Sequence, residues 1–436
     1  MSITIVLLFW ASLHYPRTIG LSIFALAVLN YLILLAFRLA NNLEPVGERP
    51  STESVTAVED SGLFFSILVP LKREGDVVVD TMNAIANLDY PAHLQEVIII
   101  VEETDIYTRD ALGRISLPAN ARICLIPELA PFTKARALLH GLEEAKGDYL
   151  TVYDAESRPE PKQLRKAALR LSSAKKRLCL QARIRINNKE TNWISRNFSA
   201  EYYEWYERHL QRLSLLDRPF GLGGNSFFVS KKEIEAAGAW DPFNVTEDAD
   251  MAVRLIENGV AMQLLDSETT EDCPVRMDEW INQRTRWNKG LLVTQMIHLP
   301  RAAVFRTFGN RGWVHFWLPM ICAGLLPFFN AFIPVFIWFS RLPFEWILLM
   351  SALLWVLLLA SVVASALINR MSYRKLGIST RLAATFADAL RYLGLHFVAG
   401  FKAWGEYFLA PLHWYKTPHE ISEKETVILK KPVYQN

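Results

Sequence analysis

The chain has 436 residues, of which 51% are hydrophobic and 21% are charged, and its formal net charge at pH 7 is +2. This composition is too apolar for an ordinary soluble enzyme, yet it leaves enough charge for a large aqueous domain, so it indicates a membrane-integral enzyme. The small net charge argues against a nucleic-acid partner, and four scattered cysteines without C-x-x-C spacing argue against a disulfide framework or a zinc site.

The N-terminal segment contains one clear apolar stretch. Residues 18–37 are almost uninterruptedly apolar and long enough to cross a bilayer, whereas residues 2–15 are shorter, and whether they span is left open. No small-residue cleavage site follows, so residues 1–40 are expected to be a transmembrane anchor and not a secretory signal. The polar residues 41–61 have the composition of a linker.

Residues 62–300 alternate between β-rich apolar runs and helical patterns, which predicts an α/β domain with a mostly parallel sheet. The candidate strands are 64–70, 96–101, 121–126, 149–153 and 178–184. The chain has neither a G-x-G-x-x-G motif nor a P-loop, which argues against dinucleotide and kinase chemistry.

The C-terminal part, residues 301–412, combines apolar and charged segments. Residues 313–339 and 346–368 are long, apolar and closely spaced, as in a helical hairpin through the bilayer, and arginines and lysines flank the pair on the cytoplasmic side. Residues 383–410 carry five ionisable side chains, so an interfacial helix and a third membrane helix that lines a polar path both stay open. Lysines in residues 413–436 favour a cytoplasmic tail, so we expect a multi-pass plasma-membrane protein with a cytoplasmic catalytic domain.

Two carboxylates directly follow an apolar run. Asp154 and Glu156 come after residues 147–153, so they are expected at the C-terminal edge of a buried strand, where open α/β sheets bind ligands. Hard oxygen ligands there suit Mg²⁺ or Mn²⁺ that also contacts a diphosphate. An acidic surface turn is the alternative, which the downstream motifs disfavour.

Thr246-Glu247-Asp248 is the second polar motif. Two adjacent acids raise the pKa of one of them, which helps a carboxylate act as a base near neutral pH. The alternative is that Thr246 caps a helix with Glu247, Asp248 and Asp250 in its first turn, and the two interpretations are compatible.

The third motif, Gln283 to Trp287, reads Gln-Arg-Thr-Arg-Trp. Helical spacing would place Gln283, Arg286 and Trp287 on one face. The planar fork of Arg286 suits a diphosphate, and Trp287 offers a ring on which a sugar can stack. A basic amphipathic helix resting on the membrane surface is the alternative.

The order and spacing of the three motifs resemble the family 2 glycosyltransferases of the processive, cellulose-synthase-like branch. Further segments look most like the bacterial exopolysaccharide-type members called XagB: 65–74, 133–138, 153–161, 222–226, 240–250 and 413–419. The resemblance covers roughly residues 60 to 420. It implies a GT-A-like fold and a metal-dependent, inverting hexosyltransferase that uses a UDP-sugar and builds a β-linked extracellular polysaccharide.

The resemblance also implies roles for individual residues. It places the general base on Asp248, with Glu247 orienting it or contacting the acceptor. It places the donor against Glu74, Glu102, Glu103, Lys134, Asp154, Gln283 and Arg286. It places the acceptor against Gly224, Asn225, Thr246 and Trp287, and the metal ion against Asp154 and Glu156.

The chain departs from the family pattern at the nucleotide end. The usual Asp-Asp pair after the second strand is replaced by Glu102-Glu103, and Asp105 is a further candidate for that role. Lys134 matches a basic position of the family, but Leu139 stands where the family usually has Asn. The glycines at 223–224 allow backbone to approach a sugar closely, or simply form a tight turn.

Three functions are compared. Polysaccharide synthesis follows most directly from the resemblance. Transfer of a single sugar to a membrane lipid is favoured by the small number of spans. A catalytically silent sugar-binding subunit is disfavoured by the intact acidic and arginine residues. The expected partners are a UDP-sugar donor, a glycan or lipid acceptor and the lipid bilayer, and oligomerisation is left open.

Overall fold

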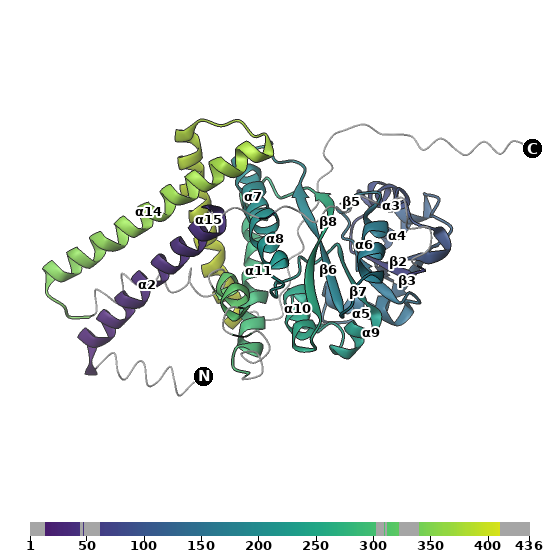
Figure 1. The fold of residues 1–436 in the computed structure, drawn as a ribbon, viewed down its shortest axis with the longest axis horizontal. Coiled ribbons are helices and arrows are strands. Elements are labelled where there is room, and N and C mark those ends of the chain that lie inside the picture. Colours follow the sequence, from purple (N-terminus) through teal and green to yellow (C-terminus); the bar gives the residue numbers. More distant parts are fainter. Residues whose placement is uncertain are drawn as a thin grey trace, which may run out of the picture.

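The computed structural model describes residues 14–43, 47, 62–301, 309, 312–321 and 340–409. An α/β body makes up most of these residues, and two long helices project from it side by side (Figure 1). The strands are β1 (Phe65–Leu71), β2 (Gln95–Glu102), β3 (Ala121–Ile126), β4 (Tyr149–Val152), β5 (Arg158–Pro159), β6 (Leu178–Ile186), β7 (Phe227–Ser230) and β8 (Ala261–Glu271). The five predicted strands are confirmed within about two residues, whereas β5, β7 and β8 were not predicted.

The strands form one sheet in the order β3-β2-β1-β4-β7-β6-β8-β5. The strands β3, β2, β1 and β4 run parallel to one another. β7 then runs antiparallel to both β4 and β6, β8 is parallel to β6, and β5 is antiparallel to β8. The sheet is therefore mostly parallel, as predicted, but β7 and β5 make it a mixed one.

Helices cover both faces of β1 and β2, which explains why most residues of these two strands are apolar and buried. Alternate residues of β1 point to opposite faces: Leu68 packs on the side of α5 (Lys134–Glu144), and Ile67 packs on the side of α3 (Val78–Ala86) and α6 (Gln163–Ser172). β2 is buried at every position. This packing fixes the C-terminal ends of β1, β2 and β4 at one edge of the sheet.

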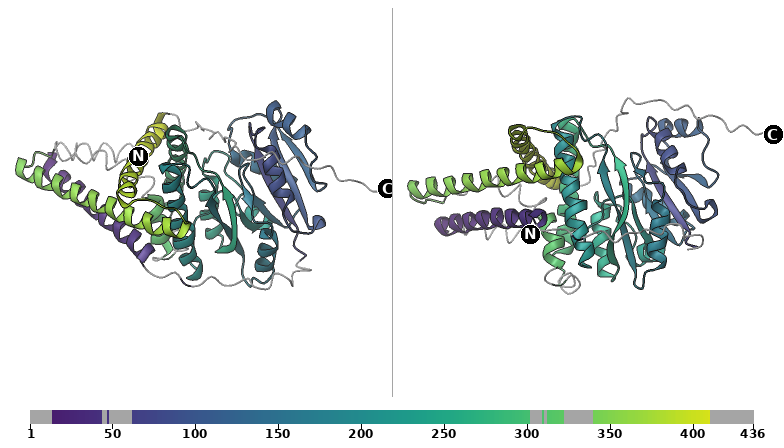
Figure 2. Two further views of the ribbon diagram at one scale, coloured as in Figure 1. Left: turned by 90° about the horizontal axis from the view of Figure 1, so that it is seen from above. Right: turned by 45° about the horizontal axis from the view of Figure 1, so that its top comes forward.

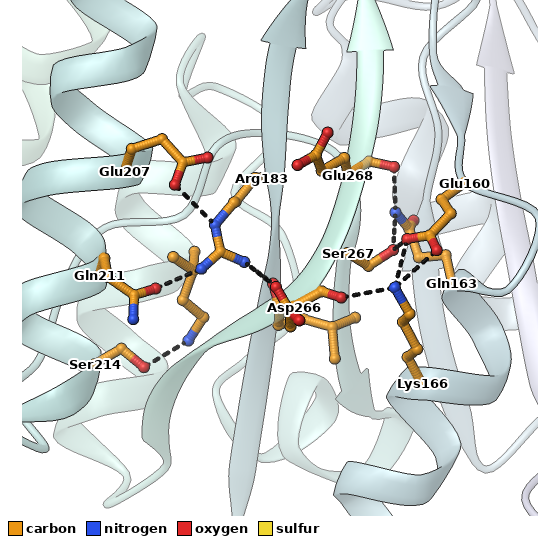
Figure 3. Close-up of polar contacts among 12 residues, drawn as sticks. Glu160, Gln163, Lys166, Arg183, Glu207, Gln211, Ser214, Asp266, Ser267 and Glu268 are labelled. Carbon is orange, nitrogen blue, oxygen red and sulfur yellow. Dashed lines mark hydrogen bonds and ion pairs between the residues drawn. The ribbon is translucent and has the colours of Figure 1, made fainter. Parts of the chain in front are cut away.

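A buried polar network joins the other half of the sheet to the helices beside it (Figure 3). Arg183 of β6 is 1% exposed and donates to Leu265 O at 2.6 Å. The same guanidinium pairs with Glu207 at 3.5 Å and with Gln211. Charge-assisted bonds of this kind hold a helix firmly against a sheet.

Glu207 and Gln211 belong to one continuous helical rod, which consists of α7 (Trp193–Tyr203), the π-helical segment η3 (Glu204–Leu210) and α8 (Gln211–Leu215). α11 (Met277–His298) and α15 (Leu382–Leu409) pack against each other, and α15 also contacts α7. Trp280 of α11 donates to the Tyr392 hydroxyl of α15 at 3.2 Å.

Two helices are long and apolar enough, by length and composition, to cross a membrane: α2 (Pro16–Leu43) and α14 (Phe344–Leu376). Both views in Figure 2 show them leaving the body together. They contain the predicted stretches at 18–37 and 346–368. Residues 322–339, which hold most of the expected first arm of the hairpin, lie outside the described residues, as do nearly all of the doubtful first segment, the linker and the tail.

The doubtful segment 383–410 is α15, and its ionisable side chains contact the body. Asp388 pairs with Arg196 of α7 at 3.0 Å, and Glu406 pairs with Lys289 of α11 at 3.6 Å. Because these charges have protein partners, α15 belongs to the packed helices around the body.

Candidate active site

A cavity of about 720 Å³ lies where the C-terminal ends of β1, β2 and β4 meet the helices. Its lining includes the predicted site residues except Glu103 and the further candidate Asp105: Glu74, Glu102, Lys134, Asp154, Glu156, Gly224, Asn225, Thr246, Glu247, Asp248, Gln283, Arg286 and Trp287. Glu103 is exposed and is not in the lining, so the structure separates it from the other candidates.

An acidic cluster lies at the edge of the sheet. Asp154 follows β4, and the Asn225 amide donates to Asp154 Oδ2 at 3.3 Å and to Glu271 Oε2 at 3.2 Å. Burial, with repulsion from Glu156 and Asp154, raises the pKa of Glu271 to about 8. Glu271 was missed by the sequence analysis because β8, which ends at it, was not predicted as a strand.

Lys134, the first residue of α5, connects the acidic cluster to the second motif. Its Nζ lies 2.5 Å from Asp154 Oδ1 and 3.6 Å from Glu247 Oε1, and it donates to Gly224 O at 2.9 Å. Burial alone would lower the pKa of Lys134, but attraction to Asp154 and Glu247 outweighs it and raises the pKa. The lysine is therefore a permanent positive charge inside the cavity.

The residues present fit a divalent cation that shares its coordination with a phosphate. Among the described residues no group of three or more His, Cys, Asp or Glu side chains is arranged to hold a metal ion by itself. Mg²⁺ is commonly bound by one or two carboxylates together with substrate phosphates, which Asp154 and Glu156 can match. The raised pKa of Glu271 shows that carboxylates are crowded here, and an added cation would relieve that crowding.

The second motif opens α10 (Glu247–Glu257). Burial raises the pKa of Asp248, whose Oδ1 accepts from Ala249 N at 2.8 Å. Burial and the neighbouring Asp248 raise the pKa of Glu247 to about 7, against the opposing effect of Lys134. Thr246 occupies the N-cap position but its side chain makes no capping bond, so that part of the helix-cap alternative is wrong.

Thr246 instead contacts α11, which carries the third motif. A Cβ at Gly290 would lie 2.4 Å from Thr246 Oγ1, so only glycine permits this approach of the two segments. Thr246 Oγ1 donates to Asn244 Oδ1 at 3.3 Å, and the Asn244 amide donates to Thr294 of α11 at 3.0 Å. The position of the second motif therefore depends on α11.

The two arginines of the third motif differ in role. Arg284 is buried, pairs with Glu201 at 2.7 Å, and lies 4.5 Å from the Phe198 and Trp287 rings. Both arginines line the cavity, and the Nε of each has no hydrogen-bond partner among the described residues, but of the two only Arg284 has a carboxylate partner there. The positive charge of Arg286 opposes the rise in the pKa of Asp248. Arg284 therefore stabilises the packing of α11 against α7, whereas the guanidinium of Arg286 can bind an anion in the cavity.

α11 is an interior helix. Trp280 and Lys289 are fully buried, and Trp287 is partly exposed where it lines the cavity. This burial contradicts the alternative of an amphipathic helix resting on a membrane surface.

The glycine turn closes the cavity beside the two motifs. Gly224 has a φ of +80°, and a Cβ there would lie 3.2 Å from Asp248 Oδ2. A Cβ at Gly223 would lie 2.2 Å from the Tyr206 hydroxyl. Tyr206, like Tyr202 and Trp205, also lines the cavity.

At the nucleotide end the structure distinguishes three acidic candidates. Glu102 is buried and pairs with Lys72 at 3.0 Å and with Arg136 at 3.3 Å. Asp105 caps α4 (Ile106–Gly113) by accepting from Thr108 N at 3.1 Å, so it serves the local fold and is not part of the cavity lining. Of the three, Glu102 is the one placed to contact a ligand.

Several curated proteins are similar in sequence to this chain. The chain is 27% identical over 232 residues to the probable glycosyltransferase YdaM of Bacillus subtilis, covering 52% of this chain and 54% of the relative. It is 26% identical over 228 residues to a β-monoglucosyldiacylglycerol synthase of Synechocystis, covering 51% and 47%. The chain thus spans about half the length of the curated relatives that it matches.

Among solved structures, the mannosyltransferase PcManGT of Pyrobaculum calidifontis, in complex with GDP-Man and Mn²⁺, has a TM-score of 0.53 at 16% identity. The match covers 87% of this chain and 99% of that one, and it shows a shared GT-A-like glycosyltransferase fold. Residues 149–368, which contain all three motifs, match the family described as glycosyl transferase family group 2. The chain therefore belongs to glycosyl transferase family group 2.

Proposed function

We propose that the protein is an inverting, metal-dependent hexosyltransferase that moves a sugar from a UDP-sugar to a hydroxyl acceptor. One observation carries the proposal. Asp154, Asp248 and Arg286 are remote in sequence, yet all three line a single cavity, together with the protonated Lys134. A carboxylate base, a metal-binding pair and free positive charge are what transfer from a diphosphate donor needs.

The proposed step is a single displacement. The acceptor hydroxyl oxygen forms a bond to the anomeric carbon, the bond from that carbon to the diphosphate oxygen breaks, and the configuration inverts. Asp248 takes the hydroxyl proton, which its raised pKa favours near neutral pH. Glu247, adjacent and tied to Lys134, orients the base or the acceptor.

The leaving UDP carries the negative charge that develops in this step. Arg286 and Lys134 are placed to stabilise it. A divalent cation held by Asp154 and Glu156 would supply further positive charge at the diphosphate. Glu102 would contact the uracil or the ribose, because Lys72 and Arg136 hold it at the end of β2.

We further propose that α2 and α14 cross the plasma membrane and that residues 62–300 lie in the cytoplasm. The bilayer-compatible length of both helices and the basic residues around residue 370 support this orientation. The paired charges of α15 support an interfacial position for that helix.

Nucleotide release tests the proposal. Purified protein in detergent with Mn²⁺ or Mg²⁺ is expected to release UDP from one or a few UDP-sugars and to form a β-linked product. Selective release of GDP from a GDP-sugar would show that the donor is a GDP-sugar and not a UDP-sugar. No release from any nucleotide sugar, with or without membrane lipids, would favour the silent-subunit alternative.

A further inference from the structure

The last residue of β8 is a carboxylate that lies in the cavity but belongs to none of the three motifs. Glu271 lines the cavity, and its Oε2 accepts from the Asn225 amide at 3.2 Å. Its Oε1 receives no hydrogen bond from any described residue and is not among the buried polar atoms that lack a partner. This second oxygen is therefore an accessible and unused acceptor.

A single amide places Glu271 beside the expected position of the diphosphate. Asn225 Nδ2 donates both to Glu271 Oε2 at 3.2 Å and to Asp154 Oδ2 at 3.3 Å. Because both carboxylates approach the same nitrogen, Glu271 is a neighbour of Asp154, which we propose holds the cation and the diphosphate. A sugar that is attached to this diphosphate must therefore begin close to Glu271.

The Asn225 amide is itself held in one orientation by a buried network. Asn225 is 3% exposed, and Ser226 Oγ donates to its Oδ1 at 2.9 Å. Ser226 Oγ lies 2.7 Å from Thr269 Oγ1, to which Gln163 Nε2 donates at 3.1 Å. Since Oδ1 is used in this network, the NH₂ group must face the two carboxylates. The direction of the Glu271 carboxylate is thus fixed before any ligand binds.

The turn that carries Asn225 also passes the proposed base. Gly224 directly precedes Asn225, and a Cβ at Gly224 would lie 3.2 Å from Asp248 Oδ2. Burial, with repulsion from Glu271 and from Asp248, raises the pKa of Tyr206, so both carboxylates lie near that ring. Glu271 therefore borders the space between Asp154 and Asp248, where a sugar must lie during transfer.

We propose, on the basis of the proposed function, that Glu271 is a specificity-determining residue that recognises one hydroxyl of the transferred hexose. Oε1 of Glu271 accepts a hydrogen bond from this hydroxyl, while Asn225 holds Oε2. A carboxyl group can bond a hydroxyl whether it is ionised or protonated. A sugar that lacks the hydroxyl is rejected, because it leaves the acceptor unpaired in a closed site.

The test pairs substitutions at Glu271 with donors that lack single hydroxyls. The donors are the preferred UDP-hexose and its monodeoxy analogues, and kcat/KM is measured from UDP release with Mn²⁺. Wild-type protein is expected to discriminate against one analogue about 10²-fold, the effect of one charged hydrogen bond. Glu271→Ala should slow the parent donor by about the same factor and leave that analogue unchanged, so that the discrimination disappears.

A conservative variant guards against a general disturbance of the site. Glu271→Gln keeps an acceptor for Asn225 and loses only the charge, so it should keep about tenfold discrimination. Its affinities for UDP and for Mn²⁺ with UDP, measured by calorimetry, should change by less than about threefold. A much weaker Mn²⁺ affinity would make Glu271 a metal ligand instead and would overturn the inference.

Glu268→Gln is the matched control. Glu268 lies on the same strand and is also partly buried, but it pairs with Arg185 at 2.6 Å and does not line the cavity (Figure 3). This variant should discriminate among the donors as the wild type does. The same loss of discrimination at both positions would show a general effect of β8 and would contradict the role of Glu271.

Two further results would overturn the inference while leaving the transferase intact. One is a wild-type enzyme that uses the parent donor and every monodeoxy analogue equally well, and the other is unchanged discrimination in Glu271→Ala. A failure of every nucleotide sugar to release nucleotide would overturn the proposed function instead. The two proposals can therefore fail separately.

Discussion

The two ends of the cavity are built in different ways. At the donor end, polar side chains follow directly from strands: Glu102 ends β2, Asp154 follows β4 and Glu271 ends β8. At the membrane end, the lining comes from the helices α2, η3, α14 and α15. A sheet edge gathers its residues by strand order, whereas the helical end exists only after distant segments have packed together.

The charges differ in the same way. The donor end crowds Asp154, Glu247 and Glu271 around Lys134, with Arg286 nearby and available. Such a site has excess carboxylate and suits a metal ion with a diphosphate. At the membrane end Arg38 is already paired with Glu204, so the charges there are matched.

The largest expected effect comes at the junction of the two ends. Asp248→Asn keeps the shape of the side chain but cannot accept the hydroxyl proton, so kcat is expected to fall about 10²–10⁴-fold. UDP affinity should remain close to that of the wild type, as measured by calorimetry. Full activity in this variant would remove Asp248 from the role of base.

Arg286→Ala is expected to reduce kcat/KM about 10²-fold, because a guanidinium that faces the diphosphate is lost. Arg286→Lys should restore only part of the rate, since a lysine lacks the planar fork. Arg284→Lys provides the contrast: its pair with Glu201 is structural, so thermal unfolding should shift more than kcat. Equal kinetic losses at both positions would contradict the division of roles.

The pH dependence should follow the acidic pair. Burial raises the pKa of Asp248, and burial together with the neighbouring Asp248 raises that of Glu247 to about 7, so Glu247 loses its charge as the pH falls through that region. Because the base must be deprotonated, kcat is expected to fall about tenfold per pH unit below the apparent pKa of the pair. A rate that stays flat while the pair titrates would show that neither carboxylate serves as the base.

The neighbouring glutamates at the donor end offer a sharp comparison. Glu102→Gln is expected to raise the KM for the donor about fivefold, by weakening a charged hydrogen bond to the nucleotide. Glu103→Gln, on an exposed side chain outside the cavity lining, should leave the KM within experimental error. The reverse pattern would move the nucleotide away from the position proposed for it.

The smallest effect is expected at the contact between the second and third motifs. A Cβ in Gly290→Ala would lie 2.4 Å from Thr246 Oγ1, so the segment before α10 must move. Overpacking of this kind costs about 1–3 kcal/mol of stability, and kcat should fall by a few-fold as Asp248 shifts. Thermal unfolding and initial rates measured together would show whether both changes occur.

Much of the donor end could be predicted from the sequence, because Asp154 directly follows an apolar strand and Gln283 to Trp287 have helical spacing. Glu271 could not, since β8 has an irregular polar pattern and lies more than a hundred residues from Asp154. Its place in the site depends on pairing with β6, which no local pattern reveals.

The membrane end was largely beyond prediction. The aromatic run at 202–206 has the composition of core or membrane-interface residues, and its role in the cavity follows from the packing of η3 against α2 and of α7 against α14.

At the donor end, the sequence alone does not distinguish the adjacent residues Glu102 and Glu103. The position at which β2 ends determines that Glu102, and not Glu103, is buried beside Lys72 and Arg136.

An experimental structure with UDP and Mn²⁺ bound would test the central claim most directly. We predict the diphosphate between Asp154 and Arg286, with phosphate oxygens about 3 Å from the guanidinium, and the uridine beside Glu102. The part of the cavity lined by α2 and α14 should remain free of nucleotide. UDP bound against Arg38 and His209 instead would contradict the assignment of both ends.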